Sequence, residues 1–113
     1  MTYSSDGFKK QIVERIYRNF LDIMILRLVR THPMWGYRII KVVARRHSVK
    51  LRHGALYPLL NDLERRGLLR STEEAKGGRV RKVYEVTSKG IQLVDAYYQF
   101  LREQLQEQDV EVD

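Results

Sequence analysis

The sequence predicts a mainly α-helical fold with a small β-hairpin, that is, an α+β domain. Three observations predict this class. Apolar residues recur at helical spacing in four separate stretches of the chain. Two short stretches flank the turn at Lys76–Gly78, as in a β-hairpin. The 113 residues, 43% of them hydrophobic and none of them cysteine, suffice for one folded domain over residues 1–113 without disulfides or Cys-ligated zinc.

The first half of the chain predicts two helices. Ile12, Ile16 and Phe20 share one stripe of a helix over residues 9–30, which ends where Pro33 forbids its continuation. A second helix is expected over residues 35–47, with Ile39 facing inward. The short alternating segment 49–52 is consistent with a minor strand.

A third helix is expected over residues 54–66. Pro58 is tolerated in a first turn, so the helix should begin close to Gly54 or Ala55. Gly67 supplies a left-handed stop. The buried stripe consists of four leucines, Leu56, Leu59, Leu60 and Leu63. The helix therefore has one buried face and a second face that is free to contact a partner.

The remaining elements are a hairpin over residues 68–86, a last helix over 88–106 and an acidic tail over 107–113. Thr87 or Ser88 should cap the last helix. Its apolar face is too wide for a solvated terminal helix, so a second copy of the chain is the expected partner. The residues expected at this homodimer interface are Ile91, Val94, Tyr97, Tyr98, Leu101 and Leu105. The order of elements predicts a winged helix-turn-helix with N- and C-terminal dimerisation helices.

The distribution of charge favours a polyanionic partner. The net charge is +7, and residues 23–61 contain no Asp or Glu but eight Lys and Arg. The last eleven residues, in contrast, contain five acids and no base. One-sided charge of this kind attracts nucleic acid. The alternative, a basic surface that only confers solubility, is the weaker interpretation of so long an acid-free stretch rich in Arg.

Double-stranded DNA is therefore the expected partner, with the helix 54–66 entering the major groove. The first residues of this helix can offer free amides at its positive end, and the Tyr57 hydroxyl can donate to a phosphate. The alternative is that Gly54 only starts the helix and Tyr57 fills the core. Cations of the hairpin would contact the DNA backbone, or alternatively would only protect an edge strand from aggregation. Cations of the helix 35–47 would contact phosphates, or alternatively would only form a solvated face. The candidate DNA-binding residues are Arg38, Lys41, Arg52, His53, Gly54, Ala55, Tyr57, Asn61, Lys76, Arg79, Arg81 and Lys82.

Other classes of function find little support in the residues. His32, His47 and His53 have no metal-ligand spacing, so no metal and no cofactor is expected. There is no nucleophile–base arrangement, so no catalytic residue is assigned and an enzyme is not expected. The N-terminal residues show no signal-peptide pattern and no apolar run approaches ~18 residues, so a cytoplasmic protein without a membrane segment is expected.

Several strings resemble the PadR-like family of winged helix-turn-helix transcriptional regulators. The resemblance covers roughly residues 20–95 and is specific only as a combination. The matching strings are Leu21–Leu26, Pro33–Lys41, Gly54–Leu60, Leu63-Glu64, Gly67-Leu68 and Arg79–Tyr84, with Thr87 and Gly90. The resemblance implies a dimeric DNA-binding protein, usually a repressor and often relieved by a small ligand.

The leading hypothesis is thus a sequence-specific, homodimeric transcriptional regulator that acts as a repressor and is relieved by a small aromatic or hydrophobic effector. Trp35, Tyr97, Tyr98 and Phe100 could line a flat aromatic pocket for such a ligand at the dimer interface, or could simply be interface core. Two alternatives stay open. One is a low-specificity, chromatin-like DNA-binding protein, and the other is a winged-helix module that binds other proteins.

Overall fold

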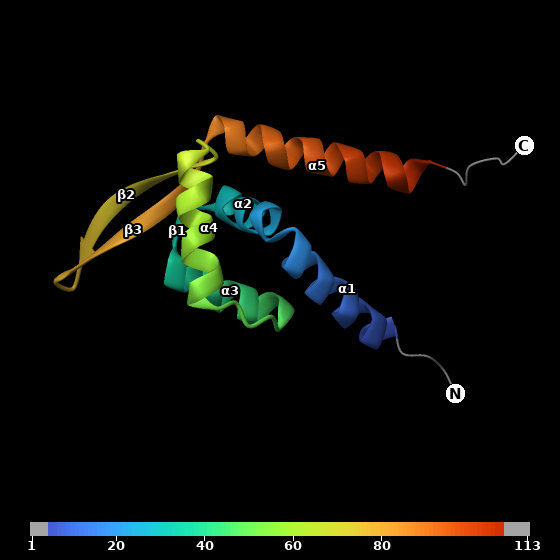
Figure 1. The fold of residues 1–113 in the computed structure, drawn as a ribbon, viewed down its shortest axis with the longest axis horizontal. Helices are drawn as coiled ribbons and strands as arrows, with labels where there is room; N and C mark the ends of the chain where they lie inside the picture. The colour runs from blue at the N-terminus through green and yellow to red at the C-terminus, as the bar shows by residue number, and fades with distance from the viewer. Residues whose placement is uncertain (1–4, 108–113) are drawn as a thin grey trace, which may run out of the picture.

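The computed structural model describes residues 5–107 and contains five α-helices and a three-stranded antiparallel sheet (Figure 1). The predicted fold class is confirmed. In chain order the elements are α1 (Ser5–Asn19), α2 (Leu21–Thr31), β1 (Met34–Trp35), α3 (Gly36–His47), α4 (His53–Arg65), β2 (Leu69–Lys76), β3 (Arg79–Val86) and α5 (Ser88–Gln106). Of the acidic tail expected over 107–113, residues 108–113 lie outside the described part.

The helix expected over residues 9–30 is two helices, α1 and α2. Phe20 leaves helical geometry, with φ −128° and ψ 37°, although its amide still donates to the Ile16 carbonyl oxygen at 2.7 Å. Local side chains favour the break: the Asn19 amide donates to the Arg15 carbonyl, and the Asp22 carboxylate accepts from the Ile23 amide at 2.8 Å. The apolar stripe runs straight through this single-residue bend, so periodicity alone could not reveal it.

The prediction of a minor strand over residues 49–52 is wrong. This segment is irregular, following a left-handed Ser48 with φ 56° that ends α3. Its alternation arises because Leu51 is buried and Val49 half-buried, without a partner strand. The third strand is instead β1, which pairs with β3 at Met34↔Tyr84 and Trp35↔Val83. The strand order is therefore β1-β3-β2, with β3 in the centre.

Helix α4 begins at His53 and holds Pro58 in its second turn, not in the first turn as expected. The proline has no amide to donate to the Gly54 carbonyl four residues earlier, so this turn of α4 lacks one backbone hydrogen bond. At the other end Gly67 is left-handed, with φ +74°. Its amide donates to the Glu64 carbonyl at 3.0 Å and the Leu68 amide to the Leu63 carbonyl at 2.9 Å, a Schellman cap.

Strands β2 and β3 form the hairpin, called the wing below. Their register runs from Leu69↔Val86 to Lys76↔Arg79. Gly77 and Gly78 connect the strands with φ +59° and +77°, the double left-handed geometry of a type I′ turn, which glycine adopts without strain. In Figure 1 the wing extends away from the helices, so its tip stands free of the core.

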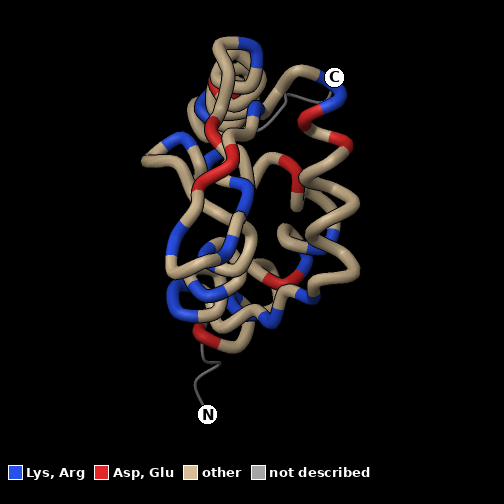
Figure 2. The backbone as a smooth tube through the Cα atoms, turned by 90° about the vertical axis from the view of Figure 1, so that its left-hand side faces the viewer, with Lys and Arg blue, Asp and Glu red and all other residues tan. Residues whose placement is uncertain are grey.

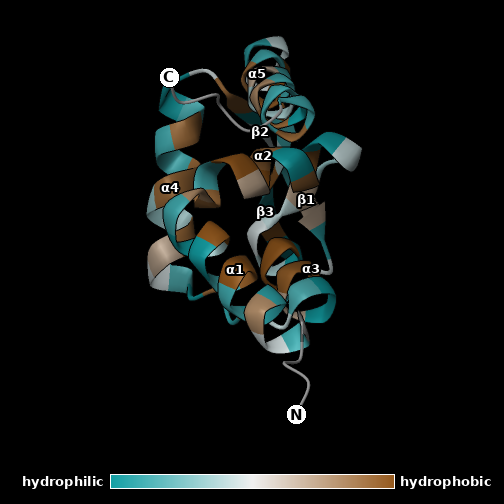
Figure 3. Cartoon of the chain, turned by 90° about the vertical axis from the view of Figure 1, so that its right-hand side faces the viewer, coloured by the Kyte–Doolittle hydropathy of each residue, from teal (hydrophilic) through white to brown (hydrophobic). Residues whose placement is uncertain are grey.

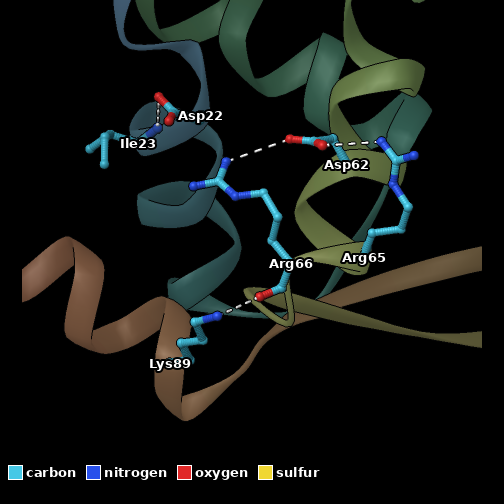
Figure 4. A network of polar contacts seen from close by, with 6 residues as sticks. All are labelled: Asp22, Ile23, Asp62, Arg65, Arg66 and Lys89. Atoms are coloured by element: carbon cyan, nitrogen blue, oxygen red, sulfur yellow. Dashed lines mark hydrogen bonds and ion pairs between the residues drawn. The ribbon is translucent and has the colours of Figure 1, made fainter.

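Helix α5 is joined tightly to the end of α4. The Thr87 hydroxyl accepts from the Gly90 amide at 3.1 Å, which caps α5, and donates to the Gly67 carbonyl at 2.6 Å. The Lys89 ammonium donates to the Arg66 carbonyl at 2.8 Å (Figure 4). Arg66 also contacts Asp62, one turn earlier in α4 (Figure 4). The orientation of α5 is thus set where α4 ends.

The core lies between α2, α3, α4 and the sheet. Its fully buried side chains are Ile25, Leu26, Val29, Ile39, Leu56, Leu60, Leu63, Leu69 and Val94. Helix α5 contributes to this core near its start and packs on α2, where Arg30 pairs with Asp95 at 2.6 Å. Hydrophobic positions also continue along α1 in Figure 3, where Phe8 is 57% exposed.

Candidate nucleic-acid interface

The first turn of α4 forms an exposed tip. His53, Gly54 and Ala55 are all exposed, and the N-cap residue Arg52 provides no side-chain cap. The leading amides of a helix lack the usual partner four residues earlier and mark its positive end. The Ala55 amide donates to the Arg52 carbonyl oxygen at 3.1 Å, so Ala55 offers its small side chain but no free amide. The tip can therefore approach an anionic surface closely, as the sequence predicts for Gly54 and Ala55.

Tyr57 lies at the side of this tip and is not a core residue, since 38% of it is exposed. Its ring stacks on the imidazole of His53, with centroids 5.5 Å apart and planes 10° from parallel. It also lies over Gly36, the first residue of α3. A Cβ atom at position 36 would come within 2.6 Å of the Tyr57 hydroxyl oxygen. Glycine at position 36 thus allows α4 to seat this phenol against α3.

The cations of α3 lie on its exposed side. Arg38 and Lys41 are both exposed, and within residues 5–107 neither forms an ion pair. The Lys41 ammonium lies 4.7 Å from the centre of the Tyr37 ring, which in turn contacts Trp35 at 5.3 Å. Lysine over an aromatic face keeps its charge available to solvent anions.

The wing carries both signs of charge along its length. Lys76 and Arg79 are exposed and face each other across the turn. Nearer the core, Glu73 lies opposite Lys82 and Glu74 opposite Arg81. Figure 2, seen from the wing side, shows these red and blue positions next to each other. The cationic character predicted for the wing is therefore concentrated at its tip.

Lys82 differs from the other predicted cations because it has a carboxylate partner. Its ammonium lies 3.6 Å from Oε1 of Glu64 on α4, and the other Glu64 oxygen accepts from the Ser71 hydroxyl. Lys82 thus holds the wing to α4. Sequence reasoning missed Glu64, because only the packing of α4 on β2 brings it to the wing.

Trp35 lies at the wing and not in the aromatic pocket that its residue type suggested. The guanidinium carbon of Arg81 lies 3.9 Å from the centre of its ring. Trp35, Arg81, Tyr57 and Asn61 line one groove between α4 and the wing, together with Gly36, Lys82 and Tyr84. Trp35 therefore lies beside the predicted DNA-binding residues and does not share a pocket with Tyr98.

The predicted interface residues of α5 divide into two groups. Val94 is fully buried in its own chain, while Ile91, Tyr97 and Tyr98 are half-buried. Leu101 and Leu105 are exposed, the latter to 86%, as is Phe100. The free apolar surface of α5 is thus its C-terminal half. The start of α5 packs on the chain's own core.

A cavity of about 140 Å³ lies among α1, α2, α3 and α5. Its lining includes Tyr17, Arg27, Arg46, His47 and Tyr98, and no carboxylate. The Arg27 Nε donates to the Tyr98 hydroxyl at 2.6 Å. Burial lowers the pKa of His47, and the neighbouring charges of Arg27, Arg46 and Lys9 lower it further. Burial also raises the pKa of Tyr17.

Two further findings concern the described residues only. Between residues 5 and 107, no three His, Cys, Asp or Glu side chains are grouped so that they could hold a metal ion. In the same part of the chain, every helix is too short or too polar to cross a membrane.

Comparisons with known proteins give a consistent family. A sequence model of the transcriptional regulator PadR-like family matches residues 25–96. Uncharacterized protein X of Lysinibacillus sphaericus is 32% identical over 79 residues, which make up 66% of this chain and 72% of that protein. Transcriptional regulator Rv3488 of Mycobacterium tuberculosis is 44% identical over 45 residues, 40% of this chain and 42% of that protein.

Solved structures agree with the sequence matches. A PadR family transcription regulator from hypervirulent Clostridium difficile has a TM-score of 0.68 and 28% identity, covering 74% of this chain and 88% of that chain. A PadR family transcriptional regulator from Eggerthella lenta has a TM-score of 0.69 and 29% identity, covering 89% and 91%. The chain therefore belongs to the PadR-like family of transcriptional regulators, and its fold is the winged helix of that family.

Proposed function

We propose that this regulator binds double-stranded DNA sequence-specifically as a homodimer and represses transcription. Helix α4 enters the major groove with its N-terminal tip, and the wing lies along the neighbouring backbone. The family membership supports regulation, and the charge and exposure of the described residues support DNA as the partner.

One observation carries the proposal: the tip of α4 is exposed, uncapped and surrounded by cations that lack carboxylate partners. Residues 23–61 contain no acid, so no negative side chain from α3 or the tip repels a phosphate. In the described part of the chain, Arg38, Lys41, Arg52, Arg79 and Arg81 form no ion pair. Their charges remain free for a polyanion.

The residues divide by role. In this proposal the exposed α4 residues Gly54, Ala55, Tyr57 and Asn61 contact base edges and the nearest phosphates. The flanking residues contact phosphates and set orientation, namely Arg38, Lys41, Arg52, His53, Lys76, Arg79 and Arg81. Lys82 contributes least, because Glu64 already neutralises it.

The proposed homodimer forms through the free apolar surface of the terminal helices. On α5 this surface includes Leu101 and Leu105, and on α1 it includes Phe8 and Ile12. Exposed apolar side chains of this size favour burial against a second copy. Two-fold symmetry then requires a pseudo-palindromic operator, with half-sites about 34–36 Å apart or a multiple of that distance.

The proposed effector would bind in the cavity that Tyr98 and Tyr17 line. Its volume of about 140 Å³ suits a single aromatic ring. The expected pocket of Trp35, Tyr97, Tyr98 and Phe100 does not form within the chain, because Trp35 lines the groove at the wing. Because Arg27, Arg46 and His47 line the cavity and no acid does, an aromatic anion suits it better than a neutral hydrophobic molecule.

Footprinting on the DNA upstream of the protein's own gene tests the function. The experiment is run at ~0.15 M salt, where weak non-specific contacts are screened. A protected pseudo-palindrome is expected, and the double variant Arg79→Ala with Arg81→Ala should lose it. Arg65→Ala with Arg70→Ala is the matched control, because it also removes two charges, at residues that already pair with Asp62 and Glu85.

The rival functions and the effector predict different results. A chromatin-like protein would protect no preferred site and would show only a salt slope of about −0.9 per neutralised phosphate. A protein-interaction module would keep its cellular activity in the Arg79→Ala, Arg81→Ala variant. For the effector, about 1 mM benzoate should raise the melting temperature while neutral benzyl alcohol should not.

A further inference from the structure

Arg81 is held in an unusual way for a cation of an exposed hairpin. Its guanidinium lies over the Trp35 side chain, with the central carbon 3.9 Å from the centre of the ring. The side chain is half-buried. Its Nε atom is buried and has no hydrogen-bond partner within the described residues. A buried donor without an acceptor costs free energy, so the arrangement requires an explanation.

A carboxylate lies across the strand from Arg81 but does not pair with it. Glu74 lies directly opposite Arg81 in the wing, yet the two form no ion pair in the described structure. Lys76 and Arg79 at the tip of the wing also form no ion pair in the described structure, but the two cations nearest the core do pair with carboxylates. Arg70 bonds to Glu85, its cross-strand neighbour, and Lys82 lies beside Glu64. Stacking on Trp35 thus keeps Arg81 apart from the acids of its own sheet.

The guanidinium lies in the groove between α4 and the wing. The same groove is lined by Tyr57 and Asn61, which add a hydroxyl and an amide, and by no carboxylate. Gly36 at its floor makes room for the Tyr57 hydroxyl. Lys82 also lines the groove, but its charge is offset by Glu64. The groove therefore combines one unpaired planar cation with two neutral hydrogen-bonding groups, a set suited to a tetrahedral monoanion such as a phosphodiester.

We propose that this groove binds one phosphodiester of the DNA strand that passes between α4 and the wing. Arg81 donates to the phosphate oxygens, and Trp35 is a positioning residue that fixes the plane of the guanidinium before DNA arrives. Tyr57 and Asn61 donate from the α4 side. Because the side chain is ordered in advance, little rotamer entropy is lost on binding. This inference rests on the proposed DNA-binding function and specifies one contact within it.

The first test measures the affinity for the footprinted operator by fluorescence anisotropy. Arg81→Ala should weaken binding about 10-fold to 100-fold, as for the loss of a charge-assisted hydrogen bond. Arg81→Lys should recover only a small part, because an ammonium cannot reproduce the planar fork. Arg70→Ala is the matched control: it removes the same charge from the same sheet at a residue already paired with Glu85. It should bind within about 2-fold of the wild type.

The second test separates positioning by Trp35 from a structural role. Trp35→Phe keeps a ring under the guanidinium and should retain most of the affinity, whereas Trp35→Leu should lose about as much as Arg81→Lys. Adding Trp35→Leu to Arg81→Ala should cause no further loss, because Trp35 acts through Arg81. Circular dichroism melts of each variant verify folding. Equal affinity of Trp35→Leu and the wild type would overturn the role of Trp35.

The third test locates the phosphate. Operators with one neutral methylphosphonate linkage at each backbone position are compared for the wild type and Arg81→Ala. One linkage should weaken wild-type binding about 10-fold and Arg81→Ala binding much less, because only the donors of Tyr57 and Asn61 still face that phosphate in the variant. If the wild type binds its operator and no such position exists, the phosphodiester site is wrong while the proposed function stands. If the wild type has no preferred sequence, the proposed function itself fails.

Discussion

Gly90→Ala is the substitution whose effect the structure defines most sharply. Gly90 is the third residue of α5, where that helix crosses the end of α4. A Cβ atom there would lie 2.3 Å from the carbonyl oxygen of Leu68 and 2.6 Å from Cγ2 of Val86. Ordinary contact requires about 3.5 Å, so α5 or the Leu68 segment must shift by about an ångström.

The expected loss of stability combines three effects. Overpacking a tight contact against backbone costs about 1–3 kcal/mol. The same Leu68 oxygen accepts the Thr87 amide at 3.1 Å, and displacing it costs about 1 kcal/mol more. Alanine returns up to about 1 kcal/mol through its better helix propensity. The free energy of unfolding should therefore fall by about 1–3 kcal/mol, which lowers the melting temperature of such a domain by about 5–20 °C.

Thermal and urea unfolding followed by circular dichroism measure this effect at one fixed protein concentration, because the proposed dimerisation would make melting depend on concentration. Gly7→Ala in α1 is the control, since no atom lies within 4 Å of a Cβ at that position. It should leave stability unchanged or raise it by up to about 1 kcal/mol. A Gly90→Ala protein that melts at or above the wild-type temperature would refute the close approach of α5 to Leu68.

Three further predictions concern the groove, the cavity and α5. Gly36→Ala places a Cβ 2.6 Å from the Tyr57 hydroxyl; the partly exposed ring can swing out, so the melting temperature should fall by less than about 4 °C while operator affinity by anisotropy falls about tenfold. The pKa of His47 is lowered from 6.5 in the folded state, so unfolding takes up a proton. The contribution of neutral His47 to the free energy of unfolding is therefore fully present above about pH 6.5 and is lost as the pH falls through the folded pKa. In urea unfolding, the free energy should fall less between about pH 7.5 and about pH 5.5 in His47→Gln than in the wild type. Leu105→Asp should weaken the proposed dimer at least about tenfold in analytical ultracentrifugation, because it puts a charge on an exposed apolar face.

Each of these has a distinct contradicting result. Full operator affinity in Gly36→Ala would mean that the position of the Tyr57 ring does not matter for DNA. A His47→Gln protein with the wild-type pH dependence would assign the acid sensitivity to other groups. Gln106→Asp adds the same charge at the next residue of α5, and an equal effect of Gln106→Asp and Leu105→Asp would remove the case for a specific apolar contact.

Local chemistry predicted the elements whose ends have their own signals. Gly67 is left-handed at the end of α4, Gly77 and Gly78 form the tip of the wing, and Thr87 caps α5. Each of these depends on residues within a few positions of the chain. The bend at Phe20 gave no such signal, because the apolar spacing of α1 continues into α2 without a change.

The remaining features arise from packing between distant segments. A strand as short as Met34–Trp35 exists only because Val83 and Tyr84 lie beside it, and no local pattern in two residues can show that. In the candidate site, sequence reasoning found the cations but not their partners. The charge of Lys82 is neutralised by Glu64, and that of Arg81 is left free by Trp35, since α4, β1 and β3 meet there.

Thr87 and Lys89 hold the start of α5 at the end of α4, and this contact is called the joint below. A small rotation at the joint displaces the far end of α5 by a larger distance. The 19 residues of α5 extend about 28 Å from the capping Thr87. A rotation of about 10° at the joint therefore moves the far end of α5 by about 5 Å. In the proposed dimer the same geometry operates in reverse, so a small change where two α5 helices meet would alter the separation of the two α4 tips. The range of half-site spacings that such a dimer tolerates would then depend on how stiffly Thr87 and Lys89 hold the end of α4.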